Sequence, residues 1–279
     1  MATMESEAYA KLERLQRLIG EMDSALVAFS GGVDSTFLLE VCVGVLRGRV
    51  LAVTAHSASL PADELSEAIE LAQRMGARHR LVETSELDNP DYARNPADRC
   101  FHCKIDVFGQ LTRLAHEAGL AYVLDGSNYD DISDFRPGAR AARQLGVRSP
   151  LQEVGLAKDE IRFLSREMGL PTWDKPSAAC LSSRIPYGQS ITADKLRQIG
   201  AAEGYLHDLG FRLVRVRHHG DLARIELPQP QIAQFVATGA ADKAMARLKE
   251  LGFLYVALDL QGYRAGSMNE ALTDRSETG

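Results

Sequence analysis

The sequence of 279 residues predicts an α/β fold, in which helices flank a parallel twisted sheet, followed by a small C-terminal α+β domain. Two observations predict the larger part. Short apolar runs without alternating polar residues, such as residues 25–29, are typical of strands covered by helices on both faces. These runs alternate with helical patterns, which indicates parallel strands joined by crossover helices. A third observation distinguishes the C-terminal part from this α/β pattern. Beyond residue 190 two predicted strands follow each other with no helix between them.

The larger part is expected to open with an amphipathic helix, because Leu12, Leu15 and Ile19 recur at helical spacing. Apolar runs then predict four strands, and helical patterns occupy the stretches between and after these strands. Two of the predicted helices end at Gly76 and Gly169. The predicted strands cover residues 25–29, 50–54, 80–82 and 122–124. One predicted helix includes residues 37–39, and the others cover residues 62–75, 100–116 and 158–168.

The C-terminal part is predicted to have the order αββαβ. Its elements are a helix over residues 193–207, strands over 212–218 and 222–227, a helix over 232–251 and a strand over 254–258. Residues 186–190 have the composition of a linker. We therefore expect a first domain over residues 1–188, a small α+β domain over 189–272, and a tail over 273–279.

Composition narrows the function classes. Acidic residues outnumber basic ones by 38 to 32, and the net charge of −6 disfavours a protein whose main partner is a nucleic acid. Four cysteines suit an intracellular enzyme better than a disulfide-stapled secreted module. The first residues are acidic, and no apolar stretch approaches the roughly 18 residues that span a bilayer. We expect a cytoplasmic protein that has no membrane partner.

A glycine-rich loop between the first predicted strand and helix is the most informative motif. It reads Ser30-Gly31-Gly32-Val33-Asp34-Ser35. Glycines let the backbone turn sharply and approach a ligand, while the two serine hydroxyls and the free amides of a helix start donate to phosphate oxygens. No lysine follows the glycines, so this is not the GxxxxGK[ST] loop. The alternative is a strand-to-helix turn capped by serine.

Polar residues also follow the predicted strand at 122–124. Asp125 and Asn128 belong to this group and fall at the carboxyl edge of the expected sheet, where open α/β folds bind ligands. Their oxygens could hold Mg²⁺ or the substrate. A polar turn without a ligand is the alternative interpretation.

Three of the four cysteines lie in reactive surroundings. Cys100 and Cys103 share one face at the start of a predicted helix, and Cys180 lies in a loop near Arg184. Three thiolates suit an iron–sulfur cluster whose fourth iron stays open. A zinc site completed by His102, or a redox pair of Cys100 and Cys103, are the alternatives. The fourth cysteine falls in an apolar helix and is expected in the core.

A basic strand is predicted in the small domain. Alternation puts Arg215, Arg217 and His219 on one face of the strand, and Val214 and Val216 on the other. Guanidinium groups match phosphate and carboxylate groups bidentately, so this face is a candidate phosphate site. Ordinary surface arginines on a solvated edge are the alternative.

These motifs resemble the PP-loop ATP pyrophosphatase superfamily, whose signature SGGxDS matches residues 30–35. The resemblance narrows to the LarE family of ATP-dependent sulfur transferases, of the three-cysteine iron–sulfur type. It is carried further by residues 95–104, 149–151, 173–188 and 215–219. The superfamily fold is similar to that of the adenine nucleotide α-hydrolases, and its members cleave ATP to AMP and pyrophosphate to activate a carboxylate or carbonyl oxygen.

The resemblance implies a substrate and its contacts. LarE proteins adenylate the carboxylates of pyridinium-3,5-biscarboxylic acid mononucleotide and convert them to thiocarboxylates, which is a step toward the nickel-pincer nucleotide cofactor of lactate racemase. The implied nucleotide contacts are the loop residues and the stretch from Thr54 to Ser57, which would lie near the adenine. The implied substrate contacts are Ser183, Arg184, Arg215 and Arg217, with Glu203 and Arg264 as further pocket residues.

The family also implies the sulfur source. Some members sacrifice the sulfur of one cysteine, which matches Cys180, and others hold a [4Fe-4S] cluster on three cysteines and transfer a sulfide from its open iron. Cys100 and Cys103 place this sequence in the second group. The implied cofactors are ATP, Mg²⁺ and the cluster, and the implied partners are a sulfide donor and further copies in a trimer or hexamer. A tRNA thiolase, an amide-forming ligase of the same superfamily and a nucleotide-sensing module are the alternative functions.

Overall fold

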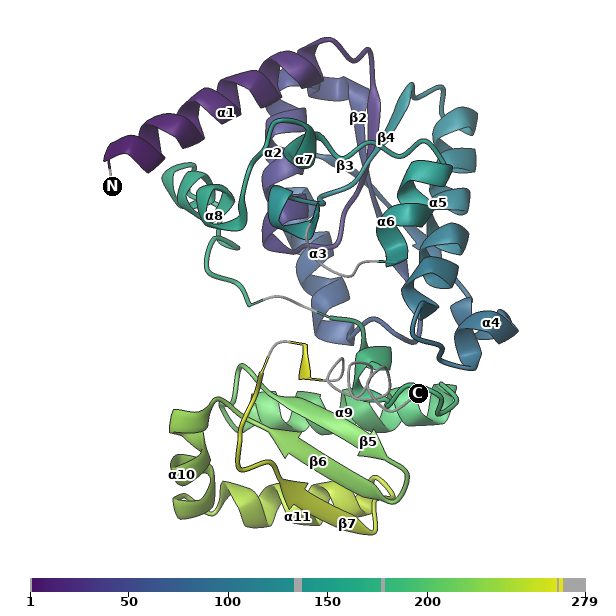
Figure 1. Cartoon of the computed structure of the whole chain (residues 1–279), viewed down its shortest axis with the longest axis vertical. Coiled ribbons are helices and arrows are strands. Elements are labelled where there is room, and N and C mark those ends of the chain that lie inside the picture. Colours follow the sequence, from purple (N-terminus) through teal and green to yellow (C-terminus); the bar gives the residue numbers. More distant parts are fainter. Residues whose placement is uncertain (1, 133–136, 177–178, 265, 268–279) are drawn as a thin grey trace, which may run out of the picture. The chain divides into compact units, whose positions relative to one another are not determined.

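The chain forms two compact units, as the computed structural model in Figure 1 shows. The structure describes residues 2–132, 137–176, 179–264 and 266–267. The first unit comprises Met1–Ser57, Ala62–Glu86 and Asp98–Ala178, and the second comprises Ala58–Pro61, Leu87–Ala97 and Ala179–Gly279. Along the part of the chain that is described, no helix combines the length and the apolar character needed to cross a membrane.

The first unit contains a four-stranded parallel sheet in the order β3-β2-β1-β4. The strands are β1 (Ala25–Ala28), β2 (Val50–His56), β3 (Arg78–Glu83) and β4 (Tyr122–Leu124). All three neighbouring pairs are parallel. The predicted α/β fold with a parallel sheet flanked by helices is therefore confirmed.

Both faces of this sheet are covered by helices (Figure 1). Val27 of β1 packs into an apolar core with Phe37 and Leu39 of α2, whereas its neighbour Leu26 packs into a second core with Phe108 of α5. The alternation of one strand between two cores explains why residues 25–29 are apolar throughout. The helices of this unit are α1 (Ala2–Gly20), α2 (Val33–Leu46), α3 (Ala62–Arg74), α5 (Arg99–Glu117), α6 (Pro137–Gln144), α7 (Pro150–Glu153) and α8 (Lys158–Glu167).

The second unit is built on a three-stranded sheet in the order β5-β6-β7. Strand β5 (Arg215–His219) is antiparallel to β6 (Leu222–Glu226), and β6 is parallel to β7 (Tyr255–Leu258). Its helices are α4 (Pro90–Ala93), α9 (Ala193–Asp208), α10 (Gln229–Ala237) and α11 (Ala240–Glu250). The core of the unit is apolar, and the rings of Phe211 and Phe235 meet edge to face at 5.2 Å between centroids.

The prediction of one helix over residues 232–251 is wrong. Two helices occupy this stretch, because Gly239 adopts a left-handed conformation with φ 73° and interrupts the chain between α10 and α11. The order is therefore αββααβ. Sequence patterns also left out the short helices α4, α6 and α7, whose few residues carry too little periodicity to be recognised.

The structural division of the chain differs from the expected boundary at residue 188. The second unit begins at Ala179 and includes two segments that precede it by many residues. The buried Asn95 explains one of them, because its side-chain amide donates to the carbonyl oxygens of Ile185, Pro186 and Gln189 at 3.2, 2.8 and 3.0 Å. Such long-range bonds are not visible in local composition. The expected tail over residues 273–279 lies outside the described residues.

Candidate active site

The glycine-rich loop joins β1 to α2 in the first unit. Gly31 has φ 70°, and a Cβ atom placed on it would lie 3.1 Å from the Cβ of Ala68 in α3. Gly32 precedes the first residue of α2. The backbone conformation and the close packing both disfavour a side chain at Gly31, so the fold alone accounts for a glycine at this position.

The two serines of the loop lie side by side. The hydroxyl oxygens of Ser30 and Ser35 are 3.0 Å apart, and the Ser35 hydroxyl also accepts from the amide of Ser30 at 3.3 Å. The loop is thus closed on itself in front of a helix of 14 residues, whose first-turn amides carry a partial positive charge. This arrangement suits an anion such as phosphate.

The turn after β4 packs directly on this loop. A Cβ atom on Gly126 would lie 2.9 Å from the backbone nitrogen of Ser35, so only glycine fits here. The adjacent Asn128 is buried, and its amide donates to Asp34 at 3.4 Å. Asp125 accepts hydrogen bonds from two nearby serines, the shorter from the Ser149 hydroxyl at 2.6 Å. The structure therefore brings Asp125 and Asn128 to the loop from a distant part of the sequence.

Two lysines that sequence reasoning missed lie at the loop. The ammonium of Lys158, the first residue of α8, is 2.5 Å from the carboxylate of Asp34. The ammonium of Lys175 lies 3.4 Å from the carbonyl oxygen of Gly31 and 2.7 Å from the carboxylates of both Glu64 and Glu67. Lys175 falls in the stretch 173–188 that carries the family resemblance, but nothing local in the sequence connects either lysine to the loop.

Lys175 remains a cation at neutral pH. Its burial lowers the pKa of the ammonium, but hydrogen bonds to Glu64 and Glu67 outweigh this effect and raise the pKa above its ordinary value. Lys158 faces Asp34, and Lys175 faces Glu64 and Glu67, so the two ammonium groups offset acidic side chains that would otherwise repel an anion from the loop.

Thr54 and Ser57, the expected adenine contacts, belong to the carboxyl end of β2. The Thr54 hydroxyl, 2% exposed, donates to the carbonyl oxygen of Phe29 at 2.7 Å and pairs with Nε2 of His79 at 2.9 Å. It therefore ties three neighbouring strands together at the edge where the loop begins. Ser57 directly follows β2 at the same edge. Burial lowers the pKa of His79, so this imidazole is neutral at pH 7.

The cysteines divide between the two units. Cys100 is exposed and stands in the first turn of α5 in the first unit, and Cys103 is half-buried and follows one turn later. The Cys103 thiol lies 3.7 Å from a carboxylate oxygen of Glu86. Cys180 is exposed and directly precedes the short 3₁₀ helix η4 (Leu181–Arg184) of the second unit. Among the residues that the structure describes, no group of three or more His, Cys, Asp or Glu side chains is arranged to hold a metal ion.

The fourth cysteine, Cys42, lies in the core as expected. Burial raises the pKa of its thiol to about 12, so it stays protonated under ordinary conditions. It therefore takes no part in the chemistry of the other thiols.

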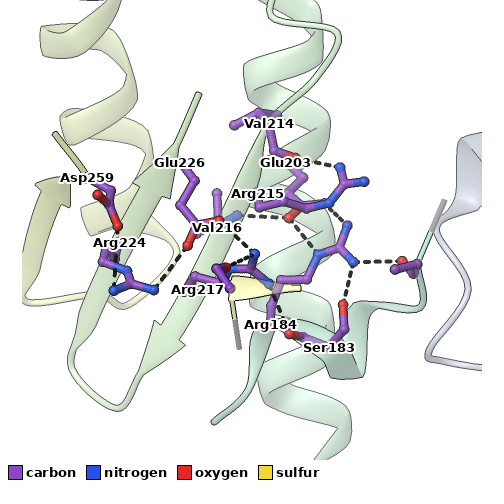
Figure 2. Close-up of polar contacts among 12 residues, drawn as sticks. Ser183, Arg184, Glu203, Val214, Arg215, Val216, Arg217, Arg224, Glu226 and Asp259 are labelled. Carbon is purple, nitrogen blue, oxygen red and sulfur yellow. Dashed lines mark hydrogen bonds and ion pairs between the residues drawn. The ribbon is translucent and has the colours of Figure 1, made fainter. Parts of the chain in front are cut away.

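The second unit contains a buried cluster of charged side chains (Figure 2). Arg184 and Glu203 pair through two hydrogen bonds of 2.9 Å, and the same carboxylate accepts from the backbone nitrogen of Val216 in β5 at 2.8 Å. Arg184 is 2% exposed, and Glu203 is also buried. Both residues were expected as substrate contacts, and the structure places them together within one unit.

The arginines of the basic strand are buried, in contrast to the alternative of a solvated edge. Arg217 pairs with Glu226 at 2.6 Å and donates to the backbone carbonyl oxygen of Ser183 at 3.1 Å. The Glu226 carboxylate also pairs with Arg224 at 3.0 Å, as Figure 2 shows. Sequence reasoning missed Glu226, although it is the register partner of Arg215 across the hairpin.

Arg215 is buried and has a different environment. Its guanidinium donates to the carbonyl oxygen of Val214 at 2.7 Å and lies 5.5 Å from the centre of the Tyr263 ring. Burial lowers the pKa of Arg215, and the positive charge of Arg184 lowers it further. A cation destabilised by burial and by a like charge is a favourable site for an anion. Arg264 directly follows Tyr263 in the chain.

Comparisons with known proteins place the chain in a family. Residues 14–93, which include the glycine-rich loop, match the NAD synthase family model. An uncharacterized protein of Synechocystis is 49% identical over 95% of this chain and 98% of its own length. The pyridinium-3,5-bisthiocarboxylic acid mononucleotide synthase of Lactiplantibacillus plantarum is 40% identical over 98% of this chain and 96% of its own length. A glutamine-hydrolysing GMP synthase of Aeropyrum pernix is 26% identical over 71% of this chain and 41% of its own length.

The match to the Lactiplantibacillus synthase covers both units, whereas the NAD synthase model covers part of the first unit only. Near-complete coverage at 40% identity is not explained by a shared nucleotide-binding domain alone. The chain therefore belongs to the LarE family of ATP-dependent sulfur transferases, within the PP-loop ATP pyrophosphatase superfamily.

Proposed function

We propose that this enzyme adenylates the carboxylates of pyridinium-3,5-biscarboxylic acid mononucleotide and converts them to thiocarboxylates, as a step in nickel-pincer nucleotide synthesis. The observation that carries the proposal is the 40% identity over 98% of the chain to a synthase of the bisthiocarboxylic product. The phosphate-binding geometry of the loop and the three thiols are the chemical parts that this reaction requires.

ATP would bind at the glycine-rich loop. Ser30, Gly31, Gly32 and Ser35 would surround the phosphates, with Lys158 nearby to balance their charge. The hard oxygen donors suited to Mg²⁺ are those of Asp34, Asp125 and Asn128, which lie at the same edge of the sheet. Thr54 and Ser57 mark the part of that edge proposed for the adenine.

The first chemical step would activate the substrate. A carboxylate oxygen of the mononucleotide attacks the α-phosphorus of ATP, the bond between the α- and β-phosphates breaks, and pyrophosphate leaves. The resulting acyl adenylate is a good acyl donor, whereas a free carboxylate is a poor one. In the second step a sulfur nucleophile attacks the acyl carbon and AMP leaves with the electron pair of the broken C–O bond.

The small domain would hold the mononucleotide. We propose Arg215 for its phosphate, because this cation is buried and lies in the positive field of Arg184, which an anion would relieve. Ser183, Arg217, Glu203 and Arg264 complete the proposed pocket, and the domain over residues 189–272 is also proposed to mediate assembly into a homo-oligomer.

Cys100, Cys103 and Cys180 would supply the sulfur chemistry. Thiolates are the ligands that iron–sulfur clusters prefer, and Cys100 stands in the first turn of α5, at the positive end of that helix. These three residues would hold a [4Fe-4S] cluster, and the cluster would supply sulfide to the activated substrate. A separate donor would deliver that sulfide to the cluster. His102 fits the zinc alternative less well, because its Nε2 already faces Asp98 at 3.7 Å.

The test is anaerobic purification with iron and sulfide analysis, followed by a turnover assay with ATP and the biscarboxylic mononucleotide. We expect pyrophosphate release, thiocarboxylate formation and iron in the wild type, and loss of iron in Cys100→Ala and Cys180→Ala. Cys42→Ala is the matched control and should keep its iron. Absence of pyrophosphate release would contradict the proposed reaction. An iron-free wild type whose mass falls by one hydrogen sulfide after turnover would show the sacrificial route instead.

A further inference from the structure

The guanidinium of Arg184 is hydrogen-bonded through all three of its nitrogens inside the second unit. Its Nε and Nη2 atoms donate to the two carboxylate oxygens of Glu203, both at 2.9 Å. Its Nη1 atom donates to the carbonyl oxygens of Ala179 and Cys180 at 2.7 and 3.1 Å, and to the Ser183 hydroxyl at 2.8 Å. Every nitrogen of this side chain thus has a protein partner, and Figure 2 shows the bonds to Glu203 and Ser183.

Two of these acceptors are backbone carbonyl oxygens next to the Cys180 side chain, namely those of Ala179 and of Cys180 itself. The Cys180 carbonyl oxygen accepts from Arg184 and also from the backbone nitrogen of Ser183 at 2.9 Å. The side chain of Cys180 is nevertheless exposed. Arg184 therefore immobilises the backbone of a cysteine whose sulfur is accessible to a reactant.

Arg184 is itself held in place by the sheet. The Glu203 carboxylate that binds it also accepts from the backbone nitrogen of Val216 at 2.8 Å, and β5 is an edge strand whose outer amides are available for such a bond. A chain of hydrogen bonds thus runs from β5 through Glu203 and Arg184 to the carbonyl oxygen of Cys180.

Further bonds hold the residues that follow Cys180. The backbone nitrogen of Leu181 donates to the carbonyl oxygen of Ser59 at 2.8 Å. The hydroxyl groups of Ser182 and Tyr92 lie 2.6 Å apart and are buried. The helix η4 is consequently fixed on several sides, and Arg184 is the one side chain among these partners that contacts the Cys180 backbone directly.

We infer that Arg184 is a positioning residue for Cys180 rather than a ligand of the substrate phosphate. This inference rests on the proposed function for the identity of the reaction, but its structural part is independent of it. A bidentate carboxylate and three further acceptors leave this guanidinium poorly suited to a second anion, whereas they fix the Cys180 backbone and hence the direction of the Cα–Cβ bond that carries its thiol.

Arg184→Lys tests the inference, because a lysine keeps the charge but cannot bind Glu203 bidentately and reach the Cys180 carbonyl at once. We expect the kcat of thiocarboxylate formation to fall at least tenfold, while the KM values for ATP and the mononucleotide and the burst of pyrophosphate release stay within twofold of the wild type. Arg247→Lys, in an exposed pair with Glu250, is the matched control and should behave as the wild type. A tenfold rise in the KM for the mononucleotide, with an equal loss of pyrophosphate release, would overturn the inference.

Hydrogen exchange separates this inference from the proposed function. In Arg184→Lys we expect the amides of Leu181, Ser183 and Ile185 to exchange at least tenfold faster, with the amides of α11 unchanged. Glu203→Gln keeps one of the two bonds to Arg184 and is the milder variant if the lysine variant does not fold. A wild type that releases no pyrophosphate would contradict the proposed reaction and leave the role of Arg184 standing. Unchanged amide exchange around Cys180 in these variants would overturn the role of Arg184.

Discussion

The ammonium of Lys158 lies 2.5 Å from the carboxylate of Asp34, although 124 positions separate the two residues in the chain. Asp34 belongs to the glycine-rich loop, and Lys158 begins α8. The pair therefore brings a cation from a distant helix to a loop that is built for an anion.

Lys158→Met is expected to weaken binding of MgATP by about tenfold, because one nearby charge is worth on the order of 1–2 kcal/mol at a partly exposed site. The free energy of unfolding should change by less than about 1 kcal/mol, since both side chains of the pair are partly exposed. Titration calorimetry with MgATP measures the first effect and urea unfolding the second. Lys249→Met, at an exposed position of α11, is the control, and equal affinities in the two variants would contradict the prediction.

Gly126→Ala should distort the glycine-rich loop, although residue 126 is not part of the loop sequence. The new methyl group would lie 2.9 Å from the backbone nitrogen of Ser35, so α2 or the turn after β4 must move. Overpacking of this kind costs about 1–3 kcal/mol, and we expect the affinity for MgATP to fall with it. Gly109→Ala is the control, because its methyl group meets nothing within 4 Å on helix α5 and should stabilise the protein by up to about 1 kcal/mol. Similar stabilities for the two variants would rule the clash out.

Asn95→Asp should be strongly destabilising although it is nearly isosteric. The side-chain amide of Asn95 donates to three carbonyl oxygens, and a carboxylate would place oxygen against oxygen in a buried site. We expect a loss of at least about 3 kcal/mol in urea unfolding. Asn89→Asp is the matched control, because the Asn89 side chain accepts a bond from the Asp91 nitrogen at the start of α4, which aspartate can do equally well. A small effect at both positions would contradict the assigned bonds.

Acidification should destabilise the first unit through His79. Burial lowers the pKa of this imidazole below the ordinary value of 6.5, so below pH 6.5 the unfolded chain binds a proton that the folded protein does not. Stability therefore falls as the pH is lowered from 6.5 to the pKa of the folded state, by at most about 1.4 kcal/mol per pH unit for one proton.

His79→Gln should reduce this dependence while keeping a donor toward Thr54, whose own proton goes to the carbonyl oxygen of Phe29. Melting temperatures between pH 7.5 and 5.5 measure the effect. A residual slope is expected from His218 and His219, whose pKa values are also lowered by burial and then by nearby cations. An unchanged slope in His79→Gln would exclude His79 as a source.

Much of the fold could be predicted because its signals are local. The apolar run at residues 25–29 marks β1, and the glycines at residues 31 and 32 mark the turn into α2. The break at Gly239 was missed, because helical periodicity continues on both sides of it and a glycine within a periodic stretch does not announce a left-handed conformation.

The candidate site was less accessible to sequence reasoning. The motif SGGxDS and the three cysteines could be recognised as chemistry, and the family resemblance extended the set to Arg184, Glu203 and Arg215. Lys158, Lys175 and Glu226 could not be found in this way, because each is defined by a partner far away in the chain or across a hairpin.

The sequence by itself determined the chemical inventory of this protein: a glycine-rich loop suited to phosphate, three cysteines outside the apolar patterns and a parallel sheet to carry the loop, each recognised from residues close to it in the chain. Tertiary structure alone decided what each charge does. Arg184 and Arg215 look alike as arginines near motifs, yet one is bound by a carboxylate and the backbone of Cys180, and the other is a buried cation destabilised by its neighbour. The physical reason is that electrostatic and hydrogen-bonding energies depend on distance and burial, which folding sets between residues far apart in sequence.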